Sequence, residues 1–582
     1  MKENIMNKRI LLASVLLFIS AAVSAQNLDP TVVVSRDYEG KLMEVHKPKL
    51  DMAVPDSVLR FDLDFDYSVS DSPYKGAYDF TPYVLDMKPS AAVREAGKLY
   101  LNAGAGYQLH PELDLVWSPD LKCKSFRLNA FARHRSFAGQ YWDIESIGGA
   151  PGLVFGRGAS DSVWKGFDMS NKAGIDGRVD WKKGVLGFEV SYDGLMQREK
   201  RPLGMSRSFN AVDASLAVRS KNKWNTRFGY LVDVDYRYGN DVLSSPSEAR
   251  LNESLLGMDA SLFTRLAEFS RIRLDLGYDM AGYDGFFSTA ASLVSVAPHY
   301  TWLKKNWDID LGVKFAKVFR AKDMSGMYQN RIQSIYPDVR IAFRGIPSMS
   351  LYVEAGGGPS LETYSSLLKY DRHLNMFYGN GWPLLDVTDQ SVYAMAGIEG
   401  SITTRFSYAF KGGYSRYALA PMSSVSYDTE YLRYIPGIYY APYSKMFAAL
   451  ECRLATERTD FDASAEYAHH MGDDQVGVLL PASFTGNASF RYNWMKRIYA
   501  GVCCEASTAR KGTLTYLHSG EISERPDSFP GYVDLGVNLE YVLSHRMSVW
   551  AKGRNLMGMT IQRSLFYAEK GPYFTLGFCL NI

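Results

Sequence analysis

Residues 573–582 have the sequence YFTLGFCLNI, and this segment decides the fold. Successive side chains of a β-strand point to opposite faces, so one face of the segment is continuously apolar. A transmembrane β-barrel uses such a strand, with lipid against the apolar face and water against the other. A strand of an ordinary sandwich has the same pattern, so other segments must decide between the two. In a barrel, the residues predicted to face lipid are Phe574, Leu576, Phe578, Leu580 and Ile582.

Two further segments place charged residues where a soluble fold would need a dry core. Residues 307–315 and 533–541 alternate apolar side chains with polar ones in the same way. Burying several unpaired charges in a dry core costs too much free energy, whereas a water-filled lumen removes that cost. The alternation therefore favours a barrel whose lumen is lined by Asp308, Asp310, Lys314, Asp534, Asn538 and Glu540.

The composition excludes several other classes of protein. The 582 residues include 14% aromatic residues and carry a net charge of +2, and the mean hydropathy is −0.19. A helical membrane protein would be more apolar, whereas the lipid-facing and water-facing positions of a barrel average to near zero. The balanced charge gives no case for nucleic-acid binding. Five cysteines are too few, and odd in number, for a disulfide scaffold.

The N-terminus has the sequence pattern expected of an export signal. Residues 1–25 combine basic residues, a short apolar run and the small residues Ser24-Ala25, which predicts a signal peptide cleaved after Ala25. Residues 26–96 contain several prolines and little periodicity. They are predicted to form a periplasmic extension or a partial insert in the lumen. Residues 97–582 would then form the barrel in the outer membrane of a Gram-negative bacterium.

The rest of the chain divides into strands of about ten residues, the length that crosses a bilayer at a tilt. The division predicts an all-β protein, a transmembrane antiparallel up-and-down β-barrel of about 22 strands, within a range of roughly 20 to 24. Short and long connections alternate, as expected when short turns lie in the periplasm and long loops outside the cell. The long loops that we expect to set specificity are 136–169, 358–388 and 417–444.

Three motifs stand in the last fifty residues: VDLGVNLE from Val533, MSVWAKGRNL with its terminal Asn555-Leu556, and Gly571-Pro572-Tyr573-Phe574. With these motifs the segment resembles the final strands of TonB-dependent receptors, in the style of outer-membrane receptors of the Bacteroidetes. The resemblance implies a barrel of 22 strands, an internal plug domain and energy supplied through TonB. The chain departs from the family because no stretch of plug length is recognisable before the barrel.

A short apolar stretch close to the predicted cleavage site also resembles a family motif. Thr31, Val32, Val33 and Val34 lie between Asp29-Pro30 and Ser35, and the stretch is similar to a TonB box, which pairs with a TonB strand by β-addition. The alternative is a β-rich tail that pairs with another partner.

The sequence contains no recognisable catalytic or metal-binding pattern. No G-x-S-x-G elbow is present. His469-His470 and Cys503-Cys504 are adjacent pairs, and neighbours on a strand point apart, so neither pair is expected to share a metal. We therefore expect no enzyme activity, no metal and no cofactor.

Aromatic residues gather in two of the predicted long loops. Tyrosine and tryptophan with polar tips make good contact surfaces for sugars, peptides or proteins. The alternative is that they belong to the interfacial aromatic girdle or to loop packing. The candidate contacts are Tyr427, Tyr431, Tyr434, Tyr439, Tyr440 and Trp382.

These observations predict an outer-membrane receptor or transporter for the uptake or passage of a solute, with specificity set by the long loops. Its expected partners are outer-membrane lipid and either TonB or a surface lipoprotein. The alternative is a non-transporting barrel subunit that contacts the other subunits of an envelope assembly or secretion complex. A third hypothesis is a soluble, secreted β-protein, which predicts that the protein can be extracted without detergent.

Overall fold

The computed structural model describes a single compact unit of the chain, since every described residue falls within residues 57–582. The described residues are 98–121, 125–147, 153–157, 163–198, 206–221, 227–244, 249–320, 334–346, 348–374, 385–403, 405–428, 433–472, 478–518 and 521–582. The predicted signal peptide, the segment 26–96 and the candidate TonB box Thr31–Val34 lie outside them. Among the described residues, no helix is long and apolar enough to span a bilayer.

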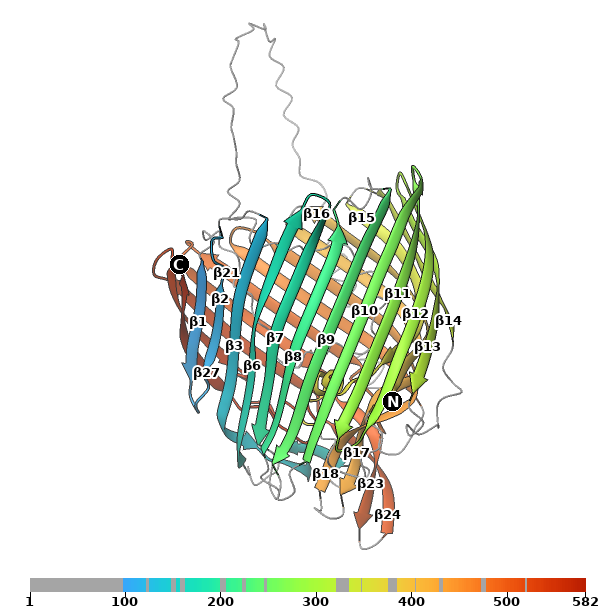
Figure 1. Cartoon of the computed structure of the whole chain (residues 1–582). Helices are drawn as coiled ribbons and strands as arrows, with labels where there is room; N and C mark the ends of the chain where they lie inside the picture. The colour runs from blue at the N-terminus through green and yellow to red at the C-terminus, as the bar shows by residue number, and fades with distance from the viewer. Residues whose placement is uncertain are drawn as a thin grey trace, which may run out of the picture. The chain divides into compact units, whose positions relative to one another are not determined.

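A closed wall of 22 antiparallel strands forms the molecule (Figure 1). Its first half consists of β1 (Leu99–Gly106), β2 (Glu112–Trp117), β3 (Phe126–Trp142), β6 (Val163–Trp181), β7 (Gly184–Arg198), β8 (Ser206–Ser220), β9 (Phe228–Ser244), β10 (Ala249–Ala267), β11 (Ser270–Gly285), β12 (Thr289–Lys304) and β13 (Trp307–Arg320). Its second half consists of β14 (Ile335–Ile346), β15 (Met349–Leu361), β16 (Val387–Thr403), β17 (Phe406–Asp428), β18 (Arg433–Ala455), β19 (Thr459–Gly472), β21 (Phe484–Trp494), β22 (Ile498–Ser507), β25 (Tyr532–Val542), β26 (Met547–Arg554) and β27 (Tyr573–Asn581).

Each wall strand pairs with the next along the chain, and β27 pairs with β1 to close the barrel, with Gly577 opposite Gly104. These glycines make room for the indole of Trp550. A Cβ at Gly577 would lie 2.3 Å from the Trp550 ring, and one at Gly104 would lie 2.4 Å from it. The indole Nε1–H donates to Asn102 Oδ1 at 2.6 Å, so the seam is held by a part-buried hydrogen bond as well as by the strand ladder.

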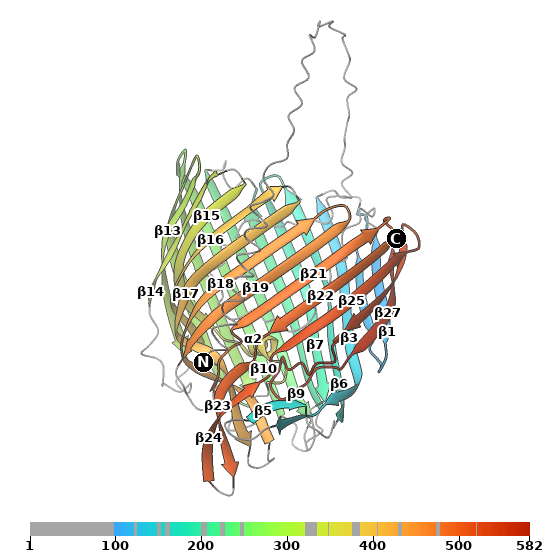
Figure 2. The same cartoon turned by 180° about the vertical axis from the view of Figure 1, so that it is seen from behind.

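The remaining elements belong to the connections at one end of the barrel. They are β4 (Ile144–Ile147), β5 (Leu153–Arg157), β20 (Val478–Leu479), β23 (Arg510–His518), β24 (Glu521–Phe529) and the helix α2 (Tyr364–Tyr370). The β23–β24 hairpin extends beyond the wall, whereas α2 lies within the outline of the barrel in both views (Figures 1 and 2). We call this end the long-loop end and the opposite end the short-turn end.

The predicted fold class and strand count are confirmed. Each of the 22 predicted segments corresponds to one wall strand, and short turns such as 182–183 and 305–306 alternate with longer connections. Two loop predictions need correction. Both ends of 136–169 belong to the paired strands β3 and β6, from Ser136 opposite Met169 to Trp142 opposite Val163. Most of 417–444 continues β17 and β18 as a paired hairpin. The pairing reaches from Phe406 opposite Leu454 to Asp428 opposite Arg433. Backbone hydrogen bonding of this hairpin therefore overrides the Tyr-rich, loop-like composition.

The two faces of the wall differ in chemistry. On one face large apolar side chains are exposed, among them Ile175, Leu216 and Met258. On the other face, which α2 packs against, neighbouring strands carry charged residues that pair with one another. The apolar face is therefore the outer face of the barrel and the charged face is the inner one.

Candidate functional site

The inner wall carries charged residues in paired rows. The guanidinium of Arg237 on β9 contacts Asp213 on β8 at 2.5 Å and Asp193 on β7 at 2.7 Å. On the next strands, Arg273 contacts Asp310 at 2.9 Å. Because these charges have partners of opposite sign on other strands, this part of the inner wall presents a polar surface without a large field of one sign.

The predicted lumen residues make contacts of this kind. Asp310 also accepts a hydrogen bond from Thr301 at 3.2 Å, and Asp308 contacts Arg344 at 3.4 Å. Lys314 is buried.

Glu540 contacts Arg491 at 2.9 Å, and Asp534 accepts from the backbone N–H of Asn555 at 3.0 Å. Asn538 lies opposite Lys552 in the register of β25 and β26. Asp308 and Asp310 lie near the short-turn end, whereas Asp534 lies beside a long loop, so the six residues do not form one site.

The C-terminal strand alternates between the faces as its sequence indicates. Phe574 is 60% exposed and Leu576 is 68% exposed, whereas Thr575 between them is 1% exposed. Phe578 and Ile582 are also exposed, and Leu580 is half-buried opposite Leu101 on β1. Their contact with lipid stays a prediction that this placement supports.

The predicted aromatic contacts are dispersed. Tyr440 is buried and its hydroxyl accepts from the backbone N–H of Asp386 at 3.2 Å, so it supports the wall instead of facing solvent. Tyr439, its neighbour on β18, is exposed. Tyr427 and Tyr434 lie opposite each other in β17 and β18, while Tyr431 and Trp382 lie outside the described residues.

Residues 362–374, between β15 and β16, fold against the inner wall. The segment contains α2, which begins with a capping box in which Thr363 and Ser366 bond each other's backbone N–H groups. Such a cap satisfies donors that a short helix would otherwise leave unpaired. The helix packs its apolar side chains against five wall strands, since its Tyr364, Leu367 and Leu368 share a core with Phe209, Leu251, Ala281, Tyr283, Leu419, Ile438 and Tyr440.

A buried ion pair holds the end of this segment. Arg207 on β8 is 1% exposed and Asp241 on β9 is 0% exposed, and they are 3.0 Å apart. The Tyr364 hydroxyl hydrogen-bonds both side chains. The Arg207 guanidinium also donates to the carbonyl oxygens of Arg372 and Leu374. A buried pair of charges needs such additional hydrogen bonds to offset the loss of hydration.

Further contacts fix the same segment to β6 and β10. Arg372 contacts Asp168 at 2.6 Å. Glu253 accepts from the backbone N–H of Ser365 at 3.2 Å and from the Tyr283 hydroxyl at 3.0 Å. Burial raises the pKa of Asp371 and lowers the pKa of His373 well below its usual value. The segment therefore carries polar groups that are held inside the protein by specific partners.

Residues 555–572, between β26 and β27, form the second inward segment. Asn555 has a positive φ of 46°, a conformation that asparagine tolerates better than most residues. Its side chain donates to the carbonyl oxygens of Met559 at 2.8 Å and Lys570 at 3.2 Å. The Asn-Leu pair noted in the sequence thus connects the two ends of this loop.

The two segments meet inside the barrel. The imidazole of His373 stacks on the ring of Tyr567, with centroids 3.7 Å apart and an angle of 4° between the planes. Arg563 contacts Glu505 on β22 at 2.7 Å, and Leu565 packs beside Phe529 in a buried cluster. We call residues 362–374 and 555–572 together the loop layer.

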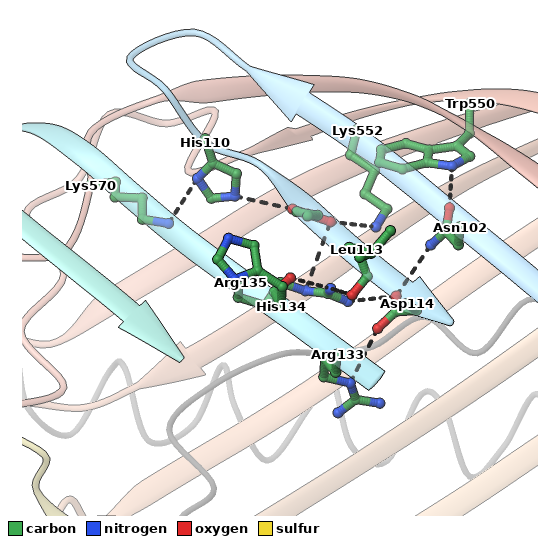
Figure 3. A network of polar contacts seen from close by, with 11 residues as sticks. Asn102, His110, Leu113, Asp114, Arg133, His134, Arg135, Trp550, Lys552 and Lys570 are labelled. Carbon is green, nitrogen blue, oxygen red and sulfur yellow. Dashed lines mark hydrogen bonds and ion pairs between the residues drawn. The ribbon is translucent and has the colours of Figure 1, made fainter. Parts of the chain in front are cut away.

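A polar chain continues from the loop layer along the inner wall (Figure 3). Lys570 contacts His110 Nδ1 at 2.9 Å, and His110 contacts Glu112 at 3.1 Å. Glu112 also contacts Lys552 at 3.2 Å. Burial lowers the pKa of Lys570 to about 8. Beyond Glu112, the chain continues through Arg135, Asp114 and Asn102 to Trp550.

Sequence reasoning missed a Ser–His–Asn group on the outer face. His134 contacts Ser136 Oγ at 2.9 Å and Asn171 Oδ1 at 2.6 Å, as in a nucleophile–base relay. The i, i+2 spacing of His134 and Ser136 on one strand was the available signal. The backbone N–H groups of Ser136 and Ala138 are both bonded, to Pro111 and Leu109, so neither can bind an oxyanion.

The same row of the sheet continues as neutral polar side chains. From His134 and Asn171 the register runs through Gly194 to Asn210, Asn240 and Asn252. Asn240 donates to Asn252 at 2.6 Å. We call His134, Asn171, Asn210, Asn240 and Asn252 the amide row. It borders the exposed apolar face on the side of the long loops, and it explains the Ser–His–Asn group as part of a structural row.

No protein-family model and no curated protein matches the sequence, whereas many solved structures share the fold. The siderophore receptor PirA from Acinetobacter baumannii matches with a TM-score of 0.58 and 12% identity, over 83% of this chain and 80% of that chain. The FrpB iron transporter from Neisseria meningitidis matches with a TM-score of 0.59 and 10% identity, over 84% and 81%. The ferric enterobactin receptor PfeA from Pseudomonas aeruginosa matches with a TM-score of 0.57 and 11% identity, over 83% and 81%. These proteins share the barrel fold that the resemblance noted in the sequence implies.

Proposed function

We propose that the protein is an outer-membrane receptor or transporter that takes up a polar solute through its lumen. The observation that carries this proposal is a closed wall of 22 strands with paired charges inside and exposed apolar residues outside. Such a wall suits lipid on one side and water on the other. In this placement Asp308, Asp310, Asn538 and Glu540 line the water-filled lumen, whereas Lys314 and Asp534 are buried on the inner face.

The loop layer would control the passage. It lies across the long-loop end and connects the β8–β11 part of the wall to β17 and β18. A solute that binds at the long loops meets this layer before it meets the charged inner wall. The exposed Tyr439 and the loops around Trp382 are the proposed outer contacts.

A barrel in the outer membrane can have protein partners on both sides of that membrane. The short turns face the periplasm, and the TonB-box candidate Thr31–Val34 would pair with a TonB strand by β-addition. Binding of a TonB C-terminal domain before and after Val33→Pro tests this part, since proline removes a backbone donor. Equal binding by both forms contradicts it. A surface lipoprotein is the proposed partner at the long loops.

Conductance across a planar bilayer tests passage through the lumen. Replacing residues 364–374 by a flexible Gly/Ser linker leaves every wall strand in place, and the conductance of this variant should exceed that of the parent chain. If both forms stay silent and co-purify with stable partner chains, the barrel is a subunit of an envelope complex instead. The receptors and transporters that share the fold favour the transport proposal.

A further inference from the structure

Basic residues dominate the short turns. In the described parts of these turns, ten residues are Lys or Arg and three are Asp or Glu. In the described connections at the long-loop end, by contrast, eight are basic and nine are acidic. The positive charge of the barrel is therefore concentrated at one end, although the net charge of the whole chain is only +2.

Two adjacent basic residues stand at three of the short turns, and a tryptophan lies within two residues of each pair. The sequences are Trp181-Lys182-Lys183, Lys304-Lys305-Asn306-Trp307 and Trp494-Met495-Lys496-Arg497. All six basic side chains are exposed. The tryptophans are 37%, 44% and 60% exposed, and each lies on the outer face, in phase with exposed apolar residues such as Ile175, Leu311 and Phe490.

Tryptophan and basic residues have complementary places at a membrane boundary. An indole sits at the level of the headgroups with its apolar body toward the acyl chains. A Lys or Arg just beyond it reaches the phosphate groups. A basic residue also lies over an exposed aromatic ring within the protein. Lys304 Nζ is 5.7 Å from the centroid of the exposed Phe269 ring.

The opposite border of the outer face has a different chemistry. There the amide row presents neutral side chains that bond one another, as in the Asn240–Asn252 contact. Beside this row stand single exposed charges of both signs, among them Lys165, Arg198, Arg250 and Asp284. Among the described residues, this border has no pair of adjacent basic residues beside a tryptophan. Such a difference between the borders is expected when the two leaflets that meet the protein carry different headgroups.

We propose that the three dibasic turns form a binding surface for the headgroups of anionic phospholipids in the leaflet at the short-turn end. This proposal rests on the membrane placement given above. The turns connect β6 to β7, β12 to β13 and β21 to β22, so they are distributed around the closed wall. A lipid leaflet surrounds the barrel and reaches all three, whereas an acidic protein partner would cover one part of the rim.

Spin-labelled lipids measure the preference directly. The full-length mature chain is reconstituted in phosphatidylcholine vesicles that contain a trace of spin-labelled phosphatidylglycerol or phosphatidylcholine. The motionally restricted fraction of each label then reports lipid at the protein boundary. We expect phosphatidylglycerol to associate about threefold more strongly, and the preference to disappear at about 1 M salt, where the screening length falls to about 3 Å.

Two sets of variants locate the preference. Substituting glutamine at all six basic positions should remove it: Lys182→Gln, Lys183→Gln, Lys304→Gln, Lys305→Gln, Lys496→Gln and Arg497→Gln. A matched pair of triple variants compares the two ends of the barrel. Lys182→Gln, Lys304→Gln and Arg497→Gln should weaken the preference, whereas Arg198→Gln, Lys369→Gln and Lys511→Gln at the long-loop end should leave it unchanged.

The outcomes separate this inference from the proposed function. Heat-modifiable mobility on gels verifies that each variant is a folded barrel. Insertion with equal association of both labels would overturn the lipid surface and leave the basic turns to an acidic protein. An undiminished preference in the sixfold variant would also overturn it. Failure of the parent chain to insert into vesicles would overturn the membrane placement itself.

Discussion

The two ends of the barrel use ionisable side chains in opposite ways. At the long-loop end Arg207 and Asp241 are 1% and 0% exposed and hold the loop layer. Near the short-turn end Arg344 and Asp308 form a pair whose side chains are 56% and 32% exposed. A buried pair fixes the position of a segment because neither charge can return to water, whereas an exposed pair stabilises little and stays available to its surroundings.

Removing one arginine at each end tests this difference between the ends, and it should give the largest effect. Arg207→Met leaves the Asp241 carboxylate buried without its ion-pair partner, which should cost about 3–5 kcal/mol. The loop layer is expected to detach while the wall stays closed, since the ladder hydrogen bonds are untouched. Hydrogen exchange at the amide of Leu367 in α2 and at the amide of its C-cap residue Asp371 should rise by several orders of magnitude.

The matched variant at the other end is Arg344→Met. Its pair with Asp308 is exposed, so the change should cost less than about 1 kcal/mol and leave α2 exchange unaltered. Equal exchange of α2 in both variants would contradict the assignment of Arg207 as the residue that holds the loop layer.

Replacing an asparagine at each end should again cost more stability at the long-loop end. The difference between the two variants should be smaller than for the two arginine variants. Asn555→Ala removes hydrogen bonds from a buried side chain to the part-buried carbonyl oxygens of Met559 and Lys570. The loss should cost about 1–3 kcal/mol. Asn306→Ala changes an exposed residue of a short turn, and should change stability by no more than about 0.5 kcal/mol. Urea titration of detergent-solubilised protein compares the two. Equal shifts would show that Asn555 does not anchor residues 555–572.

Of the predicted effects, the pH dependence of the docking of the loop layer should be the smallest. Burial lowers the pKa of His373 from its ordinary value of 6.5, so a detached segment takes up a proton below that pH while the docked one does not. Docking should therefore weaken as the pH falls from about 7.5 to about 5. Tryptic cleavage after Lys369, which is exposed, reports the detachment.

His373→Phe keeps a ring against Tyr567 and removes the titration. The raised pKa of Asp371 acts in the opposite direction, because docking that favours the protonated acid strengthens as the pH falls. The acid sensitivity that is lost in His373→Phe is therefore the contribution of the imidazole. A variant as acid-sensitive as the parent would assign the effect to other groups.

The strand prediction succeeded because alternation is local. Residues 573–582 and 307–315 show their apolar faces within a single strand, and the same face is exposed in the folded barrel. The loop 417–444 failed for the same reason. Its tyrosines and prolines resemble loop composition, and only the pairing between β17 and β18 makes it a hairpin.

The candidate site was beyond reach from the sequence. Arg207, Asp241 and Tyr364 come from three distant parts of the chain, and nothing in their local sequence marks a buried ion pair. His373 and Tyr567 lie in loops almost two hundred residues apart and meet only because both loops fold inward. Asn555 was noted as part of an Asn-Leu motif, but its role in connecting the ends of residues 555–572 needs three-dimensional contacts.

The sequence by itself determined the strands, their number and the two faces of the wall, because a period of two residues is written into neighbouring side chains. It also carried the three pairs of basic residues beside tryptophan. Only the tertiary structure decided that two long loops fold into the barrel and that the basic pairs encircle one end. Those features depend on closure of the sheet, which brings residues together across the lumen irrespective of their distance along the chain.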